Sequence, residues 1–200
     1  MKYIIRHLLS ILFSTSVLLN LTACQLLIPK AQGLQTTSWQ AQSYARQDLV
    51  EVQWKEHGFS FLLYQQQQGS QLEMVALSLT GQPLFQLIFD GQQVKVQQRI
   101  DQMKLLPFDF VVRDILFATY PEFVKMQGEN VQIQQQILSK NLPEQQNDQA
   151  DHGIATQTIL IQQQKVLSIR HLQDHIELDN VQVPYQMVFS EVPDTLENNE

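Results

Sequence analysis

The segment Phe59-Ser60-Phe61-Leu62-Leu63-Tyr64 carries apolar side chains at both odd and even positions, and residues 72–79 and 84–89 repeat this pattern. A strand with one face in water alternates apolar and polar residues, as residues 50–54 and 94–97 do. We therefore expect both faces of the three central strands to be withdrawn from bulk water. A helix should cover one face, and the other should either fold around a second core layer or line an apolar cavity.

Eight apolar residues of these strands are the candidates for lining such a cavity. The pattern leaves open which strand face points inward, because successive side chains point to opposite faces and both sets are apolar. The eight candidates are Phe59, Phe61, Leu63, Leu72, Met74, Phe85, Leu87 and Phe89.

Turn signals between the apolar runs indicate antiparallel hairpins rather than parallel units. Gly69 and the dipeptide Asp90-Gly91 are residues that tight turns favour. The remaining runs predict further strands at 49–55, 131–138, 154–161, 165–172, 175–178 and 181–189. Short strands with only one long helical pattern predict a mainly β, α+β fold with a single antiparallel sheet.

The one long helical pattern lies between Pro107 and Pro121. Apolar residues recur three or four positions apart, while Arg113 and Asp114 are expected to mark the face in water. The apolar stripe predicts either core packing or a lid over the cavity. The residues named for the lid are Phe108, Val112, Ile115, Phe117 and Tyr120.

The N-terminus has the layout of a secretory signal: Lys2 and Arg6 precede an apolar run that ends near Leu19, too short for a comfortable membrane span. Leu21-Thr22-Ala23-Cys24 then resembles the bacterial lipobox, in which the cysteine is acylated and the chain is cut before it. Cys24 is the only cysteine. Acylation explains it better than a free or buried thiol left after ordinary cleavage, because an exposed lone thiol is a liability in an oxidising compartment.

The signal implies an address as well as an anchor. Gln25 follows the cysteine, whereas lipoproteins kept in the inner membrane typically carry Asp there, so we expect an outer-membrane lipoprotein facing the periplasm. Residues 1–23 are expected to be the signal peptide and 24–47 the lipidated N-terminus and a flexible tether. Residues 48–189 should form the folded domain, and 190–200 an acidic tail without fixed structure.

Composition excludes some functions. Removal of residues 1–23 leaves 11 basic and 20 acidic residues, a formal net charge of −9, which argues against nucleic-acid binding. The 34 glutamines cluster in short runs such as 65–68 and 134–136, and we interpret these runs as solvent faces and turns.

The sequence shows no catalytic motif: no glycine-flanked serine, no zinc-binding His-Glu-x-x-His and no phosphate-binding glycine loop. His171 and His175 are four residues apart, but they fall on a predicted strand and turn with no third ligand, so we expect a surface pair and no metal. We expect no cofactor and no enzymatic activity.

The order of motifs resembles a family of uncharacterised proteobacterial lipoproteins. The resemblance is carried by Gly58-Phe59-Ser60-Phe61, Leu79-Thr80-Gly81-Gln82-Pro83-Leu84-Phe85, Asp90-Gly91, the proline-bounded helix, and a closing Ile176-x-Leu178-x-Asn180 with Tyr185. Members typically accompany gene clusters for aryl-polyene and related fatty-acid-like biosynthesis. More distantly the layout is similar to LolA and LolB, which implies an unclosed half-barrel, capped by helices, that holds acyl chains on its concave face.

These observations lead to three functional hypotheses. The first is a non-enzymatic lipoprotein that binds or delivers an acyl or polyene lipid, or a lipidated cargo, in the periplasm. The second is a scaffold that docks an envelope or biosynthetic complex through its sheet edge or glutamine-rich face, although no protein partner is indicated. The third, an enzyme acting on an acyl group, requires a buried polar cluster that the sequence does not display.

Overall fold

A computed structural model of the protein describes residues 31–138 and 154–192. The expected signal peptide, Cys24 and residues 193–200 of the expected tail lie outside the described residues, so these expectations stay predictions. The expected start of the tail at 190 is wrong, because Ser190 and Glu191 belong to the last strand and pair with Leu49 and Asp48. Among the described helices, none combines the length and the apolar character needed to span a membrane.

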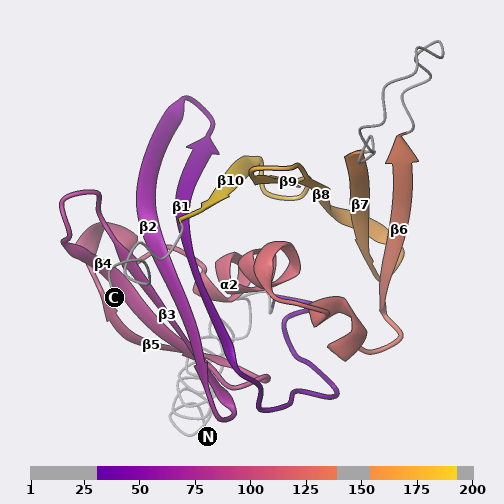
Figure 1. Cartoon of the computed structure of the whole chain (residues 1–200), viewed down its shortest axis with the longest axis horizontal. Helices are drawn as coiled ribbons and strands as arrows, with labels where there is room; N and C mark the ends of the chain where they lie inside the picture. The colour runs from indigo at the N-terminus through magenta and orange to yellow at the C-terminus, as the bar shows by residue number, and fades with distance from the viewer. Residues whose placement is uncertain (1–30, 139–153, 193–200) are drawn as a thin grey trace, which may run out of the picture. The chain divides into compact units, whose positions relative to one another are not determined.

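The described residues build one ten-stranded antiparallel sheet that curves around helix α2 (Figure 1). The spatial order is β5-β4-β3-β2-β1-β10-β9-β8-β7-β6, and the sheet is open because β5 and β6 form its two edges. The strands are β1 Tyr44–Trp54, β2 His57–Gln68, β3 Gln71–Leu77, β4 Pro83–Phe89, β5 Val94–Arg99, β6 Val131–Leu138, β7 Ile154–Ile161, β8 Gln164–His171, β9 Ile176–Asn180 and β10 Tyr185–Glu191. The predicted mainly β fold, an unclosed antiparallel sheet with a capping helix, is confirmed.

Two five-stranded meanders make up the sheet, and the pairing of β1 with β10 joins them. Val50 lies opposite Phe189 and Trp54 opposite Tyr185 in this ladder. Because β1 is also the first strand of the N-terminal meander, residues from both ends of the chain lie side by side at the centre of the sheet.

Helix α2 (Phe108–Thr119) lies against the concave face and fills the curve of the sheet (Figure 1). It begins after Pro107, whose fixed φ suits the start of a helix, and ends where Tyr120 adopts an extended conformation. Val112, Ile115 and Leu116 are fully buried. Short 3-10 helices flank α2: η2 (Asp101–Met103) precedes it and η3 (Phe123–Met126) follows it.

The two apolar faces of the central strands differ in their surroundings. Phe61 and Leu63 are buried on the concave side, whereas Leu62 is only half-buried and Tyr64 is exposed on the convex side. No second layer of described residues covers the convex face. The expectation that both faces leave bulk water is therefore correct for the concave face alone.

Strand β2 extends through the glutamine run 65–68, for which composition favours a solvent face and a turn. Gln65 and Gln67 are buried, and the hairpin turns only at Gly69-Ser70. The Gln65 amide donates a 3.1 Å hydrogen bond to the hydroxyl of Thr119, and Gln67 accepts one from the Tyr120 hydroxyl. The interpretation from composition is wrong here because the inward position of a strand decides which glutamines are buried. Thr119 at the end of helix α2 and the following Tyr120 supply their partners.

Residues 31–43 differ from the flexible tether expected over 24–47, since they pack against the folded body. Trp39 stacks on Tyr120 with ring centroids 5.1 Å apart, and its indole N–H donates to the backbone oxygen of Ser70 at 2.8 Å. The backbone N–H of Thr36 donates to the oxygen of Gly91 at 2.9 Å. Strand β1 then begins at Tyr44, several residues before the expected boundary. A local pattern does not reveal this packing, because the partners lie in the β2–β3 turn, in the β4–β5 turn and directly after α2.

Candidate functional site

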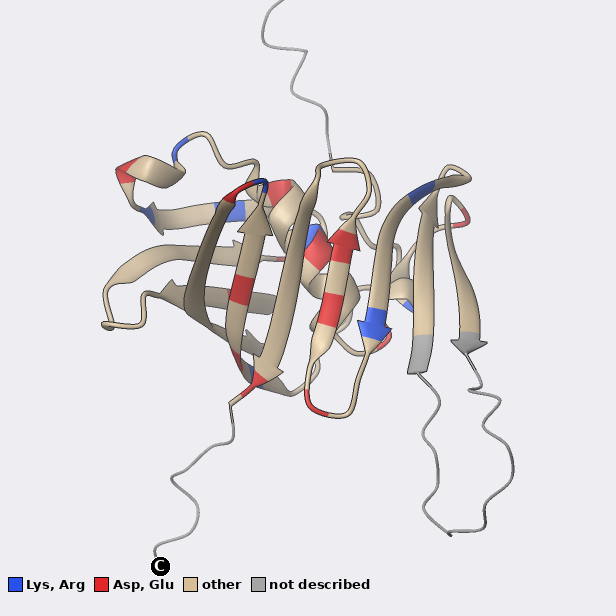
Figure 2. Ribbon diagram, turned by 90° about the horizontal axis from the view of Figure 1, so that it is seen from above, with Lys and Arg blue, Asp and Glu red and all other residues tan. Residues whose placement is uncertain are grey.

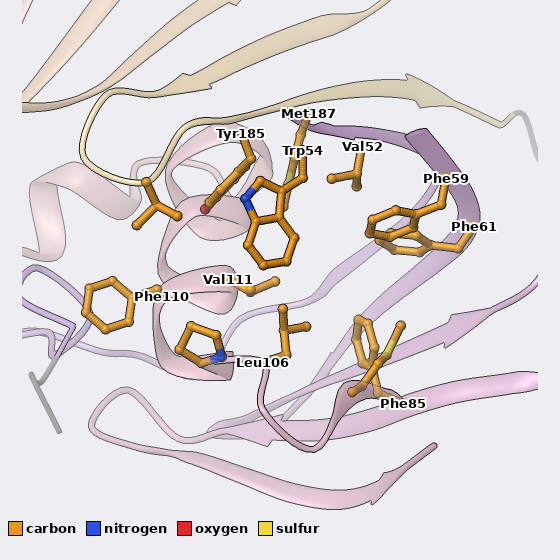
Figure 3. Close-up of a pocket in the computed structure, with 13 residues that line it drawn as sticks. Val52, Trp54, Phe59, Phe61, Phe85, Leu106, Phe110, Val111, Tyr185 and Met187 are labelled. Atoms are coloured by element: carbon orange, nitrogen blue, oxygen red, sulfur yellow. The ribbon is translucent and has the colours of Figure 1, made fainter. Parts of the chain in front are cut away.

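An apolar cavity of about 140 Å³ lies between the concave face of the sheet and the N-terminal half of α2 (Figure 3). No polar atom lines its accessible wall. The lining residues come from β1, β2, β4, η2, the loop between η2 and α2, α2 itself, the β9–β10 turn and β10. They are Val52, Trp54, Phe59, Phe61, Phe85, Met103, Leu106, Pro107, Phe110, Val111, Val183, Tyr185 and Met187.

Strand register explains why these residues meet. Val52 pairs with Phe59 on one side and with Met187 on the other, and Trp54 pairs with Tyr185. Directly opposite residues of antiparallel strands point to the same face, so this pairing gathers their side chains on the concave side. Three strands thus contribute one continuous apolar wall.

A row of aromatic rings leads from this wall into the core. The centroids of Phe59 and Phe61 are 6.1 Å apart, those of Phe61 and Phe85 are 6.0 Å apart, and those of Phe85 and Phe108 are 5.3 Å apart. Such edge-to-face and offset packing stabilises the wall beyond its buried area. The cavity is therefore bounded by packed rings on its inner side.

Apolar side chains that face water lie at the cavity wall and in the adjoining loop between η2 and α2. Trp54 is 46% exposed and Phe59 is 44% exposed, although both line the cavity. Leu105, next to the lining residue Leu106, is 96% exposed. We call Trp54, Phe59 and Leu105 the apolar rim. Exposed apolar groups around a concave site are typical of surfaces that bind apolar partners.

The structure resolves which strand face points inward and divides the eight predicted lining residues into two groups. All eight lie on the concave side, but only Phe59, Phe61 and Phe85 line the cavity. The others fill the core behind it: Leu63, Leu72, Met74, Leu87 and Phe89 are each 0% or 1% exposed.

The helix contributes residues other than those named for a lid. The five residues Phe108, Val112, Ile115, Phe117 and Tyr120 are all buried, and none of them lines the cavity. Phe110 and Val111 face it instead. The whole helix could act as a lid only if it broke this core packing.

Arg113 and Asp114 are buried rather than on a solvent-exposed face. Asp114 contacts β9 and the start of β10, and Arg113 contacts the segment before β1. Arg113 Nε donates to Asp114 Oδ1 at 2.7 Å, and Arg113 Nη1 donates to the backbone oxygen of Gln32 at 3.2 Å. Asp114 Oδ2 accepts hydrogen bonds from the Asn180 amide, at 2.6 Å, and from the Tyr185 hydroxyl. The donors offset the cost of burying the Asp114 carboxylate, although Arg113 Nη2 is buried without a partner among the described residues.

The same network contacts two residues that line the cavity, Tyr185 and Phe110, on their sides away from it. Tyr185 presents its ring to the cavity while its hydroxyl binds Asp114. Burial, reinforced by the negative charge of Asp114, raises the pKa of the Tyr185 hydroxyl well above its ordinary value, so it stays a donor. The guanidinium carbon of Arg113 lies 5.1 Å from the ring centroid of Phe110, another lining residue.

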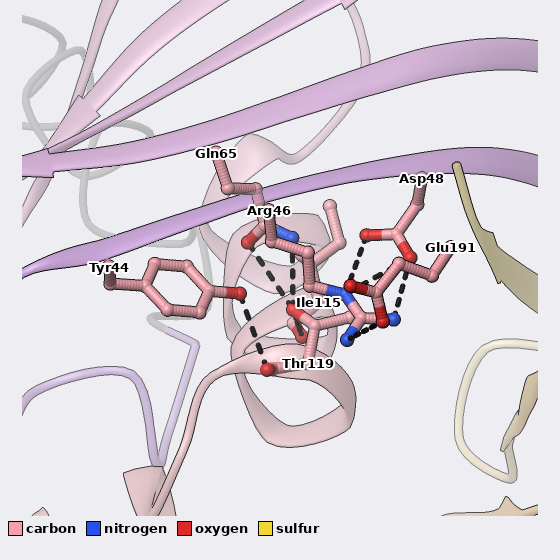
Figure 4. A network of polar contacts seen from close by, with 7 residues as sticks. All are labelled: Tyr44, Arg46, Asp48, Gln65, Ile115, Thr119 and Glu191. Atoms are coloured by element: carbon pink, nitrogen blue, oxygen red, sulfur yellow. Dashed lines mark hydrogen bonds and ion pairs between the residues drawn. The ribbon is translucent and has the colours of Figure 1, made fainter. Parts of the chain in front are cut away.

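A second polar network ties β1 to α2 and β10, away from the cavity wall (Figure 4). Arg46 forms ion pairs with Asp48 at 2.7 Å and with Glu191 at 3.2 Å. Burial raises the pKa of the Asp48 carboxyl, and the hydrogen bonds and charge of Arg46 partly offset this. The Tyr44 hydroxyl donates to the backbone oxygen of Thr119 at 3.3 Å. These contacts fix the helix against the sheet.

The two histidines of the sequence analysis lie at the sheet surface. His175 contacts Asp174 Oδ1 at 2.7 Å and Glu177 Oε1 at 3.3 Å, whereas His171 pairs with Ile176 in the β8–β9 ladder. Within 31–138 and 154–192, no group of three or more His, Cys, Asp or Glu side chains is placed to hold a metal ion.

Sequence reasoning missed the lining residues from β1, β10 and the loop before α2. The alternation of Val52 and Trp54 with polar residues is visible in the sequence, but it cannot show that Met187 and Tyr185 stand beside them. That neighbourhood depends on the pairing of the first and last strands.

Comparison with known proteins gives one family. The chain matches the family described as "Protein of unknown function (DUF3261)" over residues 45–193, which spans β1 to the end of β10. A search of curated proteins finds no match. Because the match covers more than half of the chain, the protein belongs to the DUF3261 family.

Proposed function

We propose that this protein is an outer-membrane lipoprotein that binds the apolar end of an acyl or polyene lipid, or of a lipidated cargo, and delivers it in the periplasm. The observation that carries the proposal is the cavity with a wholly apolar wall, which opens at an apolar rim. Sites for small ligands are typically concave and mostly apolar. A wall without polar groups selects hydrocarbon and offers nothing to an ionic or sugar ligand.

The size of the cavity limits what enters it. An apolar cavity of about 150 Å³ holds a benzene-sized molecule, so about 140 Å³ accommodates a group of about six carbons. The bound part is then one ring or the end of a chain, and the rest of the lipid lies along the rim formed by Trp54, Phe59 and Leu105.

The free energy of burial explains why the rim matters. Burying about six methylenes contributes about 5 kcal/mol, whereas removing a chain of about sixteen carbons from a bilayer costs roughly 12 kcal/mol. The cavity alone therefore does not compensate for extraction of a whole chain. Contact between the apolar rim and a membrane or a second apolar surface would shorten the path through water.

The proposed address rests on the sequence Leu21-Thr22-Ala23-Cys24-Gln25. Two or three acyl chains on Cys24 would anchor the chain stably, whereas one chain binds a membrane only reversibly. Labelling of cells with palmitate tests this part: the protein should incorporate the label, and Cys24→Ser should abolish it. Wild-type protein that incorporates no label would contradict the proposed lipid anchor, but it would leave the proposal of lipid binding in the cavity unaffected.

Uptake of a fluorescent fatty acid tests lipid binding. Val111 lines the cavity, so Val111→Phe should fill it and sharply reduce uptake. Val75→Phe is the matched control, because Val75 belongs to β3, is half-buried and does not line the cavity. The full chain, purified from membranes without a tag, should also carry lipid in native mass spectrometry. Absence of both co-purified lipid and uptake would overturn the proposal.

A further inference from the structure

Strand β6 is one edge of the sheet and lacks the features that usually protect an edge. It pairs with β7 over eight residues without a register shift, and no other described strand borders it. Its sequence, Val131-Gln132-Ile133-Gln134-Gln135-Gln136-Ile137-Leu138, contains no charge, proline or glycine, and residues 132–136 are all exposed. Edge strands are normally blunted by lysine, proline, bulges or short length, because their free N–H and C=O groups recruit other strands.

The opposite edge of the same sheet is protected. Strand β5 is shorter, carries Lys95 and Arg99, and pairs with β4 through a register shift at Gln86/Leu87. Helix α2 also contacts it. In Figure 2 the strand that carries Lys95 and Arg99 shows two blue segments, whereas the described part of β6 is tan throughout. The β5 edge thus has features that oppose pairing with another strand, whereas the described residues give the β6 edge none.

We propose that β6 pairs antiparallel with β6 of a second copy of this chain. Two identical edges paired antiparallel are related by a two-fold axis, which closes the assembly at a dimer. The chain has a net charge of −7, so most of its surfaces repel a second copy, but β6 carries no charge. An uncharged edge also offers no counter-charge that would select a strand from a charged partner.

The sequence of β6 favours pairing with itself. Five of its residues, Ile133-Gln134-Gln135-Gln136-Ile137, read the same in both directions about Gln135. In the symmetric register Gln135 stands opposite Gln135 of the second copy, and Gln134 stands opposite Gln136. A glutamine amide carries both donors and an acceptor, so two identical side chains can bond each other, which two lysines or two glutamates cannot do.

Disulfide trapping in native membranes tests this pairing with the full chain. Directly opposite residues of antiparallel strands have Cα atoms about 4.5–5.5 Å apart, within the range that a disulfide spans. Gln135→Cys should therefore yield a cross-linked dimer on mild oxidation. The wild-type chain, with Cys24 alone, gives the background, and Gln98→Cys on exposed β5 is the matched control at the other edge.

Adding a charge to each sheet edge in turn tests whether β6 forms the dimer contact. Gln134→Lys in the Gln135→Cys background should abolish the cross-link, whereas Gln98→Lys in that background should leave it unchanged. Both positions are exposed, and circular dichroism checks that each variant is folded. Background-level cross-linking of Gln135→Cys, equal cross-linking of Gln98→Cys, or a cross-link that survives Gln134→Lys would each overturn the proposal. The pairing does not depend on lipid binding, so fatty-acid uptake by the same variants should equal that of the wild type.

Discussion

The side-chain amide of Asn180, on β9, donates a 2.6 Å hydrogen bond to the carboxylate of Asp114, on α2. The Asn180 side-chain oxygen also accepts from the backbone N–H groups of Gln182 and Val183, at 2.9 Å and 2.8 Å. One buried side chain therefore fixes both the β9–β10 turn and the position of the helix beneath it. This turn carries Val183 to the cavity wall and leads into Tyr185.

Asn180→Asp should test that link with almost no change in shape. It would place a second carboxylate against the buried Asp114, and we expect a loss of about 3–5 kcal/mol in the free energy of unfolding at pH 7. The loss should shrink in acid, where one of the two carboxyls takes up a proton. Urea unfolding at several pH values measures it. Asn130→Asp, in an exposed turn, should cost little, and an equal cost for both variants would contradict the buried network.

Gly91→Ala should reveal how tightly residues 31–43 pack. Gly91 has a φ of +90°, and a Cβ atom there would lie 2.4 Å from Cγ of Trp39. Gly81 has a similar φ of +82°, but a Cβ atom there would meet no other atom within 4 Å, so Gly81→Ala reports backbone strain alone. We expect Gly91→Ala to cost about 1–3 kcal/mol more than Gly81→Ala in thermal or urea unfolding. Equal costs would mean that Trp39 does not pack on Gly91.

Leu105→Glu should separate the rim from the cavity. Leu105 does not line the cavity, so uptake of a soluble short-chain fatty acid should stay unchanged. Transfer of a long-chain fatty acid from vesicles should fall, because a charge at the rim opposes contact with a bilayer. Leu79→Glu, in the exposed β3–β4 turn, is the matched control. Equal transfer by both variants would contradict a role of the apolar rim in lipid transfer.

The two surface histidines should titrate on opposite sides of the ordinary value of 6.5. Hydrogen bonds to Asp174 and Glu177 raise the pKa of His175, whereas partial desolvation at the sheet surface and the charge of Arg46 lower the pKa of His171. The His175 contribution to stability is then present below pH 6.5 and is lost as pH rises through its raised pKa. NMR titration checks both values, and Asp174→Asn should bring the His175 pKa down. A His175 pKa at or below 6.5 would contradict the contacts described.

Much of the fold follows from local pattern. The limits expected for 131–138 and 154–161 are those of β6 and β7, and the helix expected after Pro107 ends one residue early. These elements are visible in the sequence because strand alternation, turn residues and helical spacing act between near neighbours. The strand pattern also indicates that the sheet has an apolar inner face, but it does not show which residues of that face line the cavity.

The errors arise where distant segments meet. The sequence predicts that Arg113 and Asp114 face solvent, because charged residues on a helix usually do. Both are buried instead: Asp114 binds Asn180 of β9, and Arg113 binds the backbone of Gln32. Gln65 and Gln67 look like turn residues, yet they bind Thr119, the last residue of α2, and Tyr120, which follows it. In each case a buried polar group finds a partner more than fifty positions away. Periodicity reports which face is apolar, but it does not report which polar group has a partner.

Fluorescence quenching by an acyl chain brominated near its methyl end tests the central claim most directly. The chain has two tryptophans: Trp54 lines the cavity, and Trp39 packs on Phe89 and Tyr120 without lining it. Bromine quenches tryptophan on contact, so Trp39→Phe protein, which reports Trp54 alone, should be strongly quenched. Trp54→Phe protein, which reports Trp39, should be quenched little. Equal quenching of the two, or none in either, would contradict the binding of an apolar chain end in this cavity.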